Sequence, residues 1–230
     1  MHIPDGFINA PTSIAAGVAA AGGVGVSLKK AAQTLEDKQA PLAGLVAAFI
    51  FAVQMLNFPV AAGTSGHLLG GALAAVLVGP WAGALCVTLV LIVQGLFFAD
   101  GGLSALGLNV INMAIVTAWG GYAIFLASRS VLPKSRTGVV IATVIASFLA
   151  VILASMTFVL EYAIGGVGDA PVSTVFGAMV GVHALIGMGE ALISGFTVAA
   201  VMAVRPDLVY GAKDLMPQLE MRAVQPAPGR

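Results

Sequence analysis

Between Gln39 and Ser128 the sequence carries a single charged side chain, that of Asp100. This stretch contains several apolar runs near the length, about 20 residues, that a helix needs to cross a bilayer. Over the whole chain only 9% of the residues are charged and 59% are hydrophobic, whereas soluble domains carry roughly 25% charged residues. A surface so poor in charge is incompatible with a water-soluble fold. We therefore expect an all-α integral membrane protein.

Apolar runs and the residues that break helices predict about seven transmembrane helices. We place them at Thr12–Leu28, Pro41–Leu56, Leu68–Val78, Trp81–Phe98, Ala105–Ala127, Gly138–Ala163 and Val175–Val204. Gly79 and Pro80 end the short third helix, and Pro206 follows the last one. We expect one transmembrane domain over residues 1–214 and a disordered cytoplasmic tail over residues 215–230.

The distribution of charge predicts how the chain is oriented. If the N-terminus lies outside and the helices alternate, all ten Lys and Arg residues fall on the inner side of the membrane. The outer side then holds acidic residues and no basic ones: Asp5, Asp100, Glu161 and Asp169. This split follows the positive-inside rule. We therefore expect an outer N-terminus and a cytoplasmic C-terminus.

The first residues, MHIPDGFINAP, contain an acid and no base, unlike the start of a cleaved signal peptide. We expect Met1 to remain as a free terminus, because the bulky His2 disfavours removal of the initiator residue. A free α-amine has a pKa of about 8, so it can lose its proton and bind a metal. Together with the peptide nitrogen and ring of His2 it forms fused chelate rings, which suit nickel, copper or cobalt. Segment 1–11 is therefore a candidate metal-binding segment; the alternative is that His2 is merely a terminal residue in water.

The polar, glycine-rich segment 57–67, NFPVAAGTSGH, separates the second and third expected helices. The third helix has about eleven residues and rises roughly 16 Å, about half the thickness of the hydrocarbon core. We therefore expect segment 57–67 to be a re-entrant loop, shielded from lipid by protein. His67 begins the short helix on the outer side, where Met1 and His2 also lie. It is a candidate fourth nitrogen ligand, or else a histidine that only forms hydrogen bonds.

Further polar residues lie in apolar surroundings and are candidates for contacts around the ligands or for an ion path. They are Asn57, Ser65, Asp100, Asn109, His183 and Glu190. His183 and Glu190 are seven residues apart and therefore share one face of the last helix. The alternative for both is hydrogen bonding between helices. Cys86 is the single cysteine, which excludes an intrachain disulfide, and we expect it to be buried.

Four segments together carry a family resemblance: MHIPDGF, NFPVAAGTSGHLLGG, FADGGLSALGLNVIN and VHALIGMGEALI. The chain resembles the CbiM/NikM family, the substrate-binding membrane components of cobalt and nickel energy-coupling-factor transporters. The resemblance implies a six-helix core with an added N-terminal helix, in a prokaryotic plasma membrane. It also implies that Met1 and His2 hold the metal together with His67. Co²⁺ or Ni²⁺ would be the transported substrate, for use in pathways such as cobalamin biosynthesis, and no catalytic cofactor is expected.

The sequence contains no GxxxxGK[ST] phosphate-binding loop, so we expect energy for transport to come from partners. The resemblance implies a CbiQ/NikQ-like coupling protein, CbiO/NikO-like ATPases and a separate small CbiN/NikN-like membrane protein. We therefore expect a transporter subunit and not an enzyme, with no nucleic-acid partner. The N-terminal segment is expected to be tied to the bundle only through the first helix, and so to be its moving part.

Two alternatives come from other classes of protein. Residues 63–66 match the GxSG motif of rhomboid intramembrane proteases, which would pair Ser65 with His183 in a catalytic dyad. This interpretation leaves His2 and His67 without a role. The other alternative is a passive metal channel, which the strength of the expected nitrogen ligands disfavours.

Overall fold

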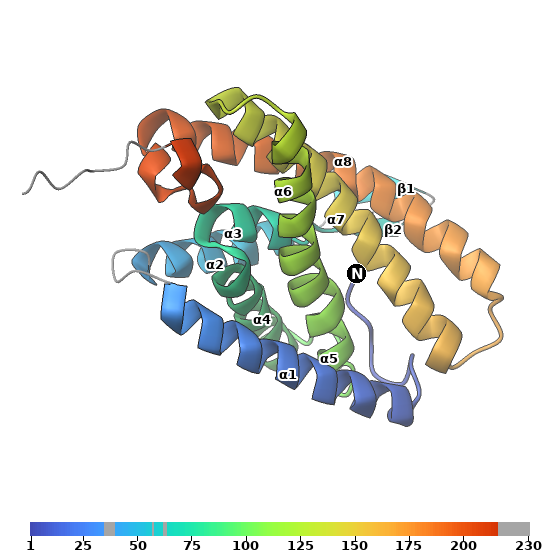
Figure 1. The fold of residues 1–230 in the computed structure, drawn as a ribbon. Helices are drawn as coiled ribbons and strands as arrows, with labels where there is room; N and C mark the ends of the chain where they lie inside the picture. Colours follow the sequence, from blue (N-terminus) through green and yellow to red (C-terminus); the bar gives the residue numbers. More distant parts are fainter. Residues whose placement is uncertain (35–39, 57, 62–63, 216–230) are drawn as a thin grey trace, which may run out of the picture.

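The computed structural model describes residues 1–34, 40–56, 58–61 and 64–215, with the backbone alone described at 58–61 and 64–66. These residues are helical apart from one short hairpin and connecting loops (Figure 1). The helices are α1 (Ala10–Thr34), α2 (Ala40–Gln54), α3 (Gly71–Val78), α4 (Pro80–Phe97), α5 (Leu106–Asn109), α6 (Gly121–Val131), α7 (Arg136–Gly165) and α8 (Val172–Val204). A π-helix, Val110–Gly120, joins α5 to α6 in one continuous helix. Two 3-10 turns follow α8, and of the tail expected over 215–230 only Leu215 is among the described residues.

Five helices in the described part of the chain are long and apolar enough to cross a membrane, by length and composition. They are α1, α4, the continuous helix Leu106–Val131, α7 and α8. Helix α2 has 15 residues and α3 has eight, both short of the roughly 20 that a full span needs. The chain is thus an all-α multi-pass membrane protein, as predicted. The count of seven spans and the orientation stay predictions.

Glycine and proline set the boundary between α3 and α4. Gly79 has a φ of 90°, a conformation that favours glycine, and it ends α3. Pro80 is the first residue of α4, where its missing N–H removes no helical hydrogen bond. The predicted boundary is therefore correct. The start of α3 lies three residues later than expected, at Gly71 instead of Leu68, so the helix is even shorter.

The segment between α2 and α3 contains a hairpin that the sequence analysis did not predict. Strand β1 (Phe58–Ala61) pairs antiparallel with β2 (Thr64–Gly66). Such pairing satisfies backbone N–H and C=O groups that an irregular loop would leave without partners. Asn57 lies outside the described residues. The insertion of this segment into the membrane remains a prediction.

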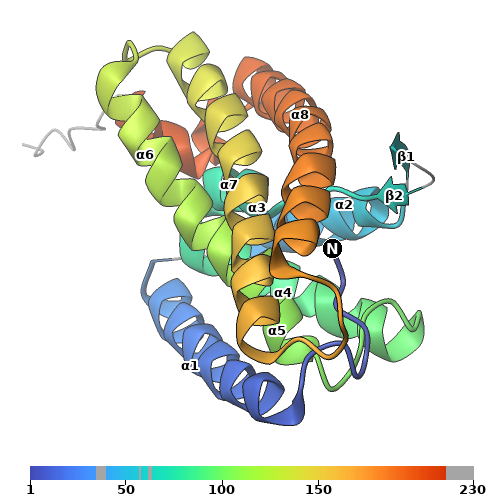
Figure 2. The same ribbon diagram turned by 90° about the vertical axis from the view of Figure 1, so that its right-hand side faces the viewer.

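Helix α3 lies at the centre of the bundle. All eight of its residues are buried, and it contacts α4, the π-helix, α6 and α7. Helices α7 and α8 pack against each other on one side of it, and α1 lies on another side against α4 and α5 (Figures 1 and 2). The N-terminal segment runs back from α1 toward the middle of the molecule (Figures 1 and 2). The first residue of the chain thereby contacts His67, in the loop that precedes α3.

Candidate metal-binding site

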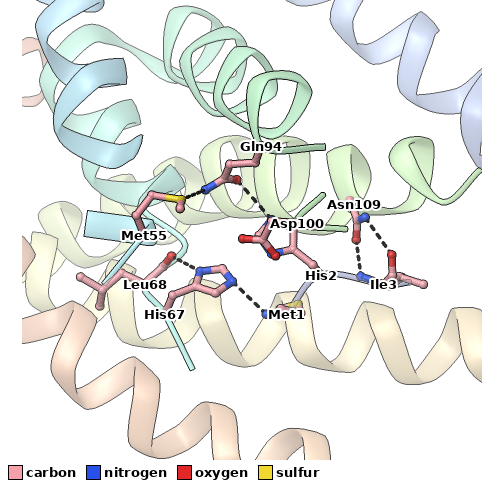
Figure 3. Close-up of polar contacts among 9 residues, drawn as sticks. All are labelled: Met1, His2, Ile3, Met55, His67, Leu68, Gln94, Asp100 and Asn109. Carbon is pink, nitrogen blue, oxygen red and sulfur yellow. Dashed lines mark hydrogen bonds and ion pairs between the residues drawn. The ribbon is translucent and has the colours of Figure 1, made fainter. Parts of the chain in front are cut away.

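The first element of the site is the loop that carries His67. This residue follows β2 and is 5% exposed. Its Nδ1 lies 2.8 Å from the carbonyl oxygen of Leu68. Because a carbonyl can only accept, Nδ1 carries the proton and Nε2 has a free lone pair. That Nε2 lies 3.1 Å from the amine of Met1 (Figure 3).

Two buried side chains hold this loop from behind. The carboxylate of Glu190, on α8, accepts a hydrogen bond from Leu69 N–H at 2.6 Å and from Gly70 N–H at 2.9 Å. The side-chain amide of Gln54, on α2, donates to the Leu69 carbonyl at 2.7 Å. Glu190 and Gln54 are each 1% exposed. The backbone next to His67 is therefore fixed to two different helices.

The ring of His2 lies beside that of His67, with 4.8 Å between the ring centroids. Its Nδ1 is 2.9 Å from a carboxylate oxygen of Asp100, and its Nε2 is 3.2 Å from the amide oxygen of Gln94. Gln94 lies in the last turn of α4 and also contacts the sulfur of Met55 (Figure 3). Both nitrogens of the His2 ring thus face acceptors from α4 and the loop that follows it.

The backbone of the N-terminal segment is fixed by the start of the continuous helix. Ile3 N–H donates to the side-chain oxygen of Asn109 at 2.7 Å, and the Asn109 amide donates back to the Ile3 carbonyl at 3.2 Å. Gly102 N–H donates to the same carbonyl at 2.8 Å. Asp5 accepts hydrogen bonds from the backbone and hydroxyl of Ser104. These contacts set the register of Met1 and His2 relative to the bundle.

Further along, the same segment pairs with the end of α7. Ile8 forms a β-bridge with Gly166, and Asn9 N–H donates to the carbonyl of Gly165 at 2.7 Å. The expectation that the segment is tied only through α1 is therefore wrong. It arose because these partners are distant in sequence and leave no local signal.

Two consecutive glycines allow the N-terminal segment to lie close to the loop that follows α4. Gly101 has a φ of 93°, and a Cβ there would lie 3.2 Å from Cδ2 of the His2 ring. A Cβ at Gly102 would collide with the backbone nitrogen of Asp5. The paired glycines after Asp100 are thus required for contact with the terminus.

Burial favours the neutral form of the Met1 amine. Burial lowers the pKa of the Met1 amine from about 8 to about 6, although the nearby Asp100 carboxylate acts in the opposite direction. The pKa of Asp100 is itself lowered, mainly by the hydrogen bond with His2. At neutral pH the amine nitrogen therefore has a lone pair available.

The remaining candidate residues have different positions. His183, on α8, is 5% exposed and its Nδ1 contacts the carbonyl of Met179. Glu190 acts on the His67 loop through backbone hydrogen bonds, as described above. Ser65 lies in β2, and its side chain is not among those described, while Asn57 is outside the described residues. Cys86 is buried, as expected, and its thiol contacts the Ala43 carbonyl.

Sequence reasoning missed the two glutamines, Gln54 and Gln94, that contact the site. Both are fully polar residues within otherwise apolar helices, and both are buried. An unpaired amide in such surroundings is costly, so its presence in an apolar run is a signal that a partner exists. Another pair, Asn112 and Glu161, forms a buried hydrogen bond of 2.6 Å between the π-helix and α7. Glu161 therefore lies near the end of α7, with its side chain buried against the π-helix.

The chemistry of the cluster is dominated by nitrogen. Among the described residues no group of three or more His, Cys, Asp or Glu side chains forms a metal cage. The atoms that converge are instead the main-chain amine of Met1 and the rings of His2 and His67. Fold and site together define a multi-pass membrane protein with a partly buried, nitrogen-rich cluster at its N-terminus.

The chain belongs to the CbiM family, since residues 2–208 match the family model described as "Cobalt uptake substrate-specific transmembrane region". It is 37% identical over 210 residues to a putative metal transport protein of Haloquadratum walsbyi, covering 91% of this chain and 94% of that one. It is 39% identical over 212 residues to a putative fused nickel transport protein NikMN of Archaeoglobus fulgidus, covering 91% and 68%. It is 34% identical over 174 residues to a cobalt transport protein CbiM of Sorangium cellulosum, covering 74% and 76%.

The fold is also similar to that of a solved protein. The crystal structure of a truncated transition metal transporter superposes with a TM-score of 0.80 at 30% sequence identity, covering 88% of this chain and 99% of that one. The family and fold confirm a substrate-specific component of a metal transporter. They give no support to the protease or channel alternatives.

Proposed function

We propose that this chain captures Co²⁺ or Ni²⁺ for import, using the Met1 amine, the peptide nitrogen and ring of His2, and Nε2 of His67. The observation that carries the proposal is the 3.1 Å approach of the Met1 amine to His67 Nε2, with the His2 ring alongside. Met1 and His67 are 66 residues apart in the sequence. An ion placed between them would receive nitrogen ligands from both. Such a set suits nickel and cobalt.

Binding requires one rearrangement of His2. Fused chelate rings through the Met1 amine and the His2 peptide nitrogen close through Nδ1 of His2, which now faces Asp100. The ring must therefore turn Nδ1 toward the ion. Nε2–H is then left to donate to a neighbouring acceptor, such as Asp100 or Gln94. Ligand histidines are commonly oriented by such a bond from their second nitrogen.

The binding site accounts for capture but not for the energy of transport. We propose that a CbiQ/NikQ-like coupling protein and CbiO/NikO-like ATPases drive uptake, with the N-terminus outside and the C-terminus cytoplasmic. The fused NikMN relatives carry, by their name, a second component in the same chain. This supports a CbiN/NikN-like membrane protein as a further partner of the present chain. The chain itself would have no catalytic role.

Replacing His2 by alanine tests the chelate. The change removes the imidazole but keeps the terminal amine, the peptide nitrogen and the length of the segment, so metal affinity should fall by at least about tenfold although the protein still reaches the membrane. The matched control is Ile14→Ala, an exposed position on α1, with membrane insertion measured for both. Wild-type metal affinity in His2→Ala would refute the proposed site.

A further inference from the structure

Gln94 presents its side-chain oxygen to the ring of His2. The residue lies in the last turn of α4 and is fully buried. Its Oε1 lies 3.2 Å from Nε2 of His2, and its own Nε2 lies 3.9 Å from the sulfur of Met55 (Figure 3). A thioether sulfur accepts hydrogen bonds and has none to donate, so the N–H side of the amide faces Met55. The oxygen of the amide must then face His2.

The orientation of this amide decides which nitrogen of the His2 ring keeps a proton. An amide oxygen can only accept, so the nitrogen that faces it, Nε2 of His2, must donate. A ring nitrogen that carries a proton has no lone pair for a metal. The other ring nitrogen, Nδ1, lies 2.9 Å from a carboxylate oxygen of Asp100. It is therefore the nitrogen at which an ion can replace a proton.

The main chain of Gln94 supports the second acceptor as well. Its carbonyl oxygen accepts hydrogen bonds from Phe98 N–H at 3.0 Å and from Asp100 N–H at 3.2 Å. Ala99, between them, has a φ of 51°, in the left-handed region that residues other than glycine seldom adopt. This turn brings the chain back to the end of α4 and places Asp100 against Nδ1 of His2. Gln94 thus supports both nitrogens of the His2 ring, one directly and one through Asp100.

We propose that Gln94 is a positioning residue that directs the transported ion to Nδ1 of His2. This inference rests on the proposed function. The fused chelate through the Met1 amine and the His2 peptide nitrogen closes through Nδ1, because Nε2 lies on the far side of the ring. With a proton held on Nε2, the nitrogen that closes the chelate is available and the other one is blocked. Gln94 thereby favours ions that displace the proton of a peptide nitrogen over ions that bind a single imidazole.

Nitrogen NMR of the metal-free, full-length and untagged protein in detergent tests the tautomer directly. The chain has three histidines, and the His2→Ala variant identifies the signals of His2 among them. In the wild type, Nε2 of His2 should carry a proton. In Gln94→Leu, which removes the acceptor and retains bulk, the ring should keep its proton on Nδ1, where Asp100 accepts it. An Nε2 without a proton in the wild type would overturn the proposal, whether or not the variant folds.

Ni²⁺ loading gives a second readout. Nickel in a planar set of nitrogens, with a deprotonated peptide nitrogen among them, has a characteristic visible absorption. Gln94→Leu should bind Ni²⁺ roughly 10- to 100-fold more weakly than the wild type and show less planar absorption per bound ion. Gln94→Glu, which keeps an oxygen toward His2, should retain that absorption. Leu96→Ala, an exposed position on the same helix, is the control and should change neither quantity.

The outcomes distinguish this inference from the proposed function. An unchanged absorption spectrum per bound ion in Gln94→Leu, at whatever affinity, would show that Gln94 does not select the nitrogen and would overturn its role alone. Loss of the planar absorption in Gln94→Glu would overturn the role of the oxygen in the same way. Absence of planar absorption in the Ni²⁺-loaded wild type, or wild-type affinity in His2→Ala, would instead refute the chelate on which the inference rests.

Discussion

Replacing Glu190 should weaken metal binding although this carboxylate contacts no proposed ligand atom. Its two oxygens accept hydrogen bonds from Leu69 and Gly70 N–H, immediately after His67. All three residues are buried, so water does not compete for these groups. The carboxylate therefore stabilises the loop conformation in which His67 Nε2 faces the Met1 amine.

The magnitude follows from the number of donors left without an acceptor. Each buried N–H that loses its partner costs about 1–3 kcal/mol. In Glu190→Gln one oxygen remains, so one N–H is lost, and the binding-competent loop is disfavoured by a factor of roughly 5 to 150. In Glu190→Ala both are lost, a cost of about 2–6 kcal/mol, which is a factor of at least roughly 30. Apparent affinity falls with the population of the competent state.

Competition titration with a metal indicator, on protein purified in detergent, measures these affinities. We expect the metal affinity to be highest in the wild type, lower in Glu190→Gln and lowest in Glu190→Ala. Leu192→Ala is the matched control, since this residue is exposed on the same helix and only two positions away. A Glu190→Ala protein that is folded by circular dichroism and binds metal within twofold of wild type would show that Glu190 does not position His67.

Three further predictions concern the ligands and the energy source. His67→Ala should lower metal affinity by at least about tenfold, as measured by the same titration, and unchanged binding would make His67 purely structural. Because the pKa of the buried Met1 amine is lowered to about 6, protons occupy its lone pair below that pH. Metal affinity should therefore fall as pH decreases from 7 to 5, and an equal affinity at both values would exclude the amine as a ligand. The chain alone in liposomes should bind metal without accumulating it, whereas adding coupling protein and ATPases should give ATP-dependent uptake; accumulation driven by a proton gradient alone would contradict this assignment.

Local sequence signals were sufficient for the helical membrane fold. The charge-poor stretch predicted membrane helices, and Gly79 with Pro80 predicted the end of α3, because their conformational limits act within a few residues. The π-helix Val110–Gly120 and the hairpin after α2 were not predicted. Neither element leaves a distinct pattern of apolar residues in the sequence.

The candidate ligands could likewise be predicted from residue chemistry and family resemblance. The residues that hold these ligands in place could not. The contacts of Gln94 with His2, of Asn109 with Ile3 and of Glu190 with Leu69 join residues 92, 106 and 121 positions apart. Contacts between residues so far apart leave no periodic pattern that could be recognised in a single sequence. What it does show is that an amide or carboxylate in an apolar helix needs a partner.

The way the site is supported determines how the ion can leave it. His2 is held by Gln94 and Asp100, and the next residue, Ile3, by Asn109 at the start of the continuous helix. The His67 loop is held by α2 through Gln54 and by α8 through Glu190. The ligands thus belong to two separately supported groups, which meet where the Met1 amine and the His2 ring contact His67. We expect a relative shift of the helices behind them to separate the ligands while the supporting hydrogen bonds stay intact, so that release needs no unfolding of the N-terminal segment.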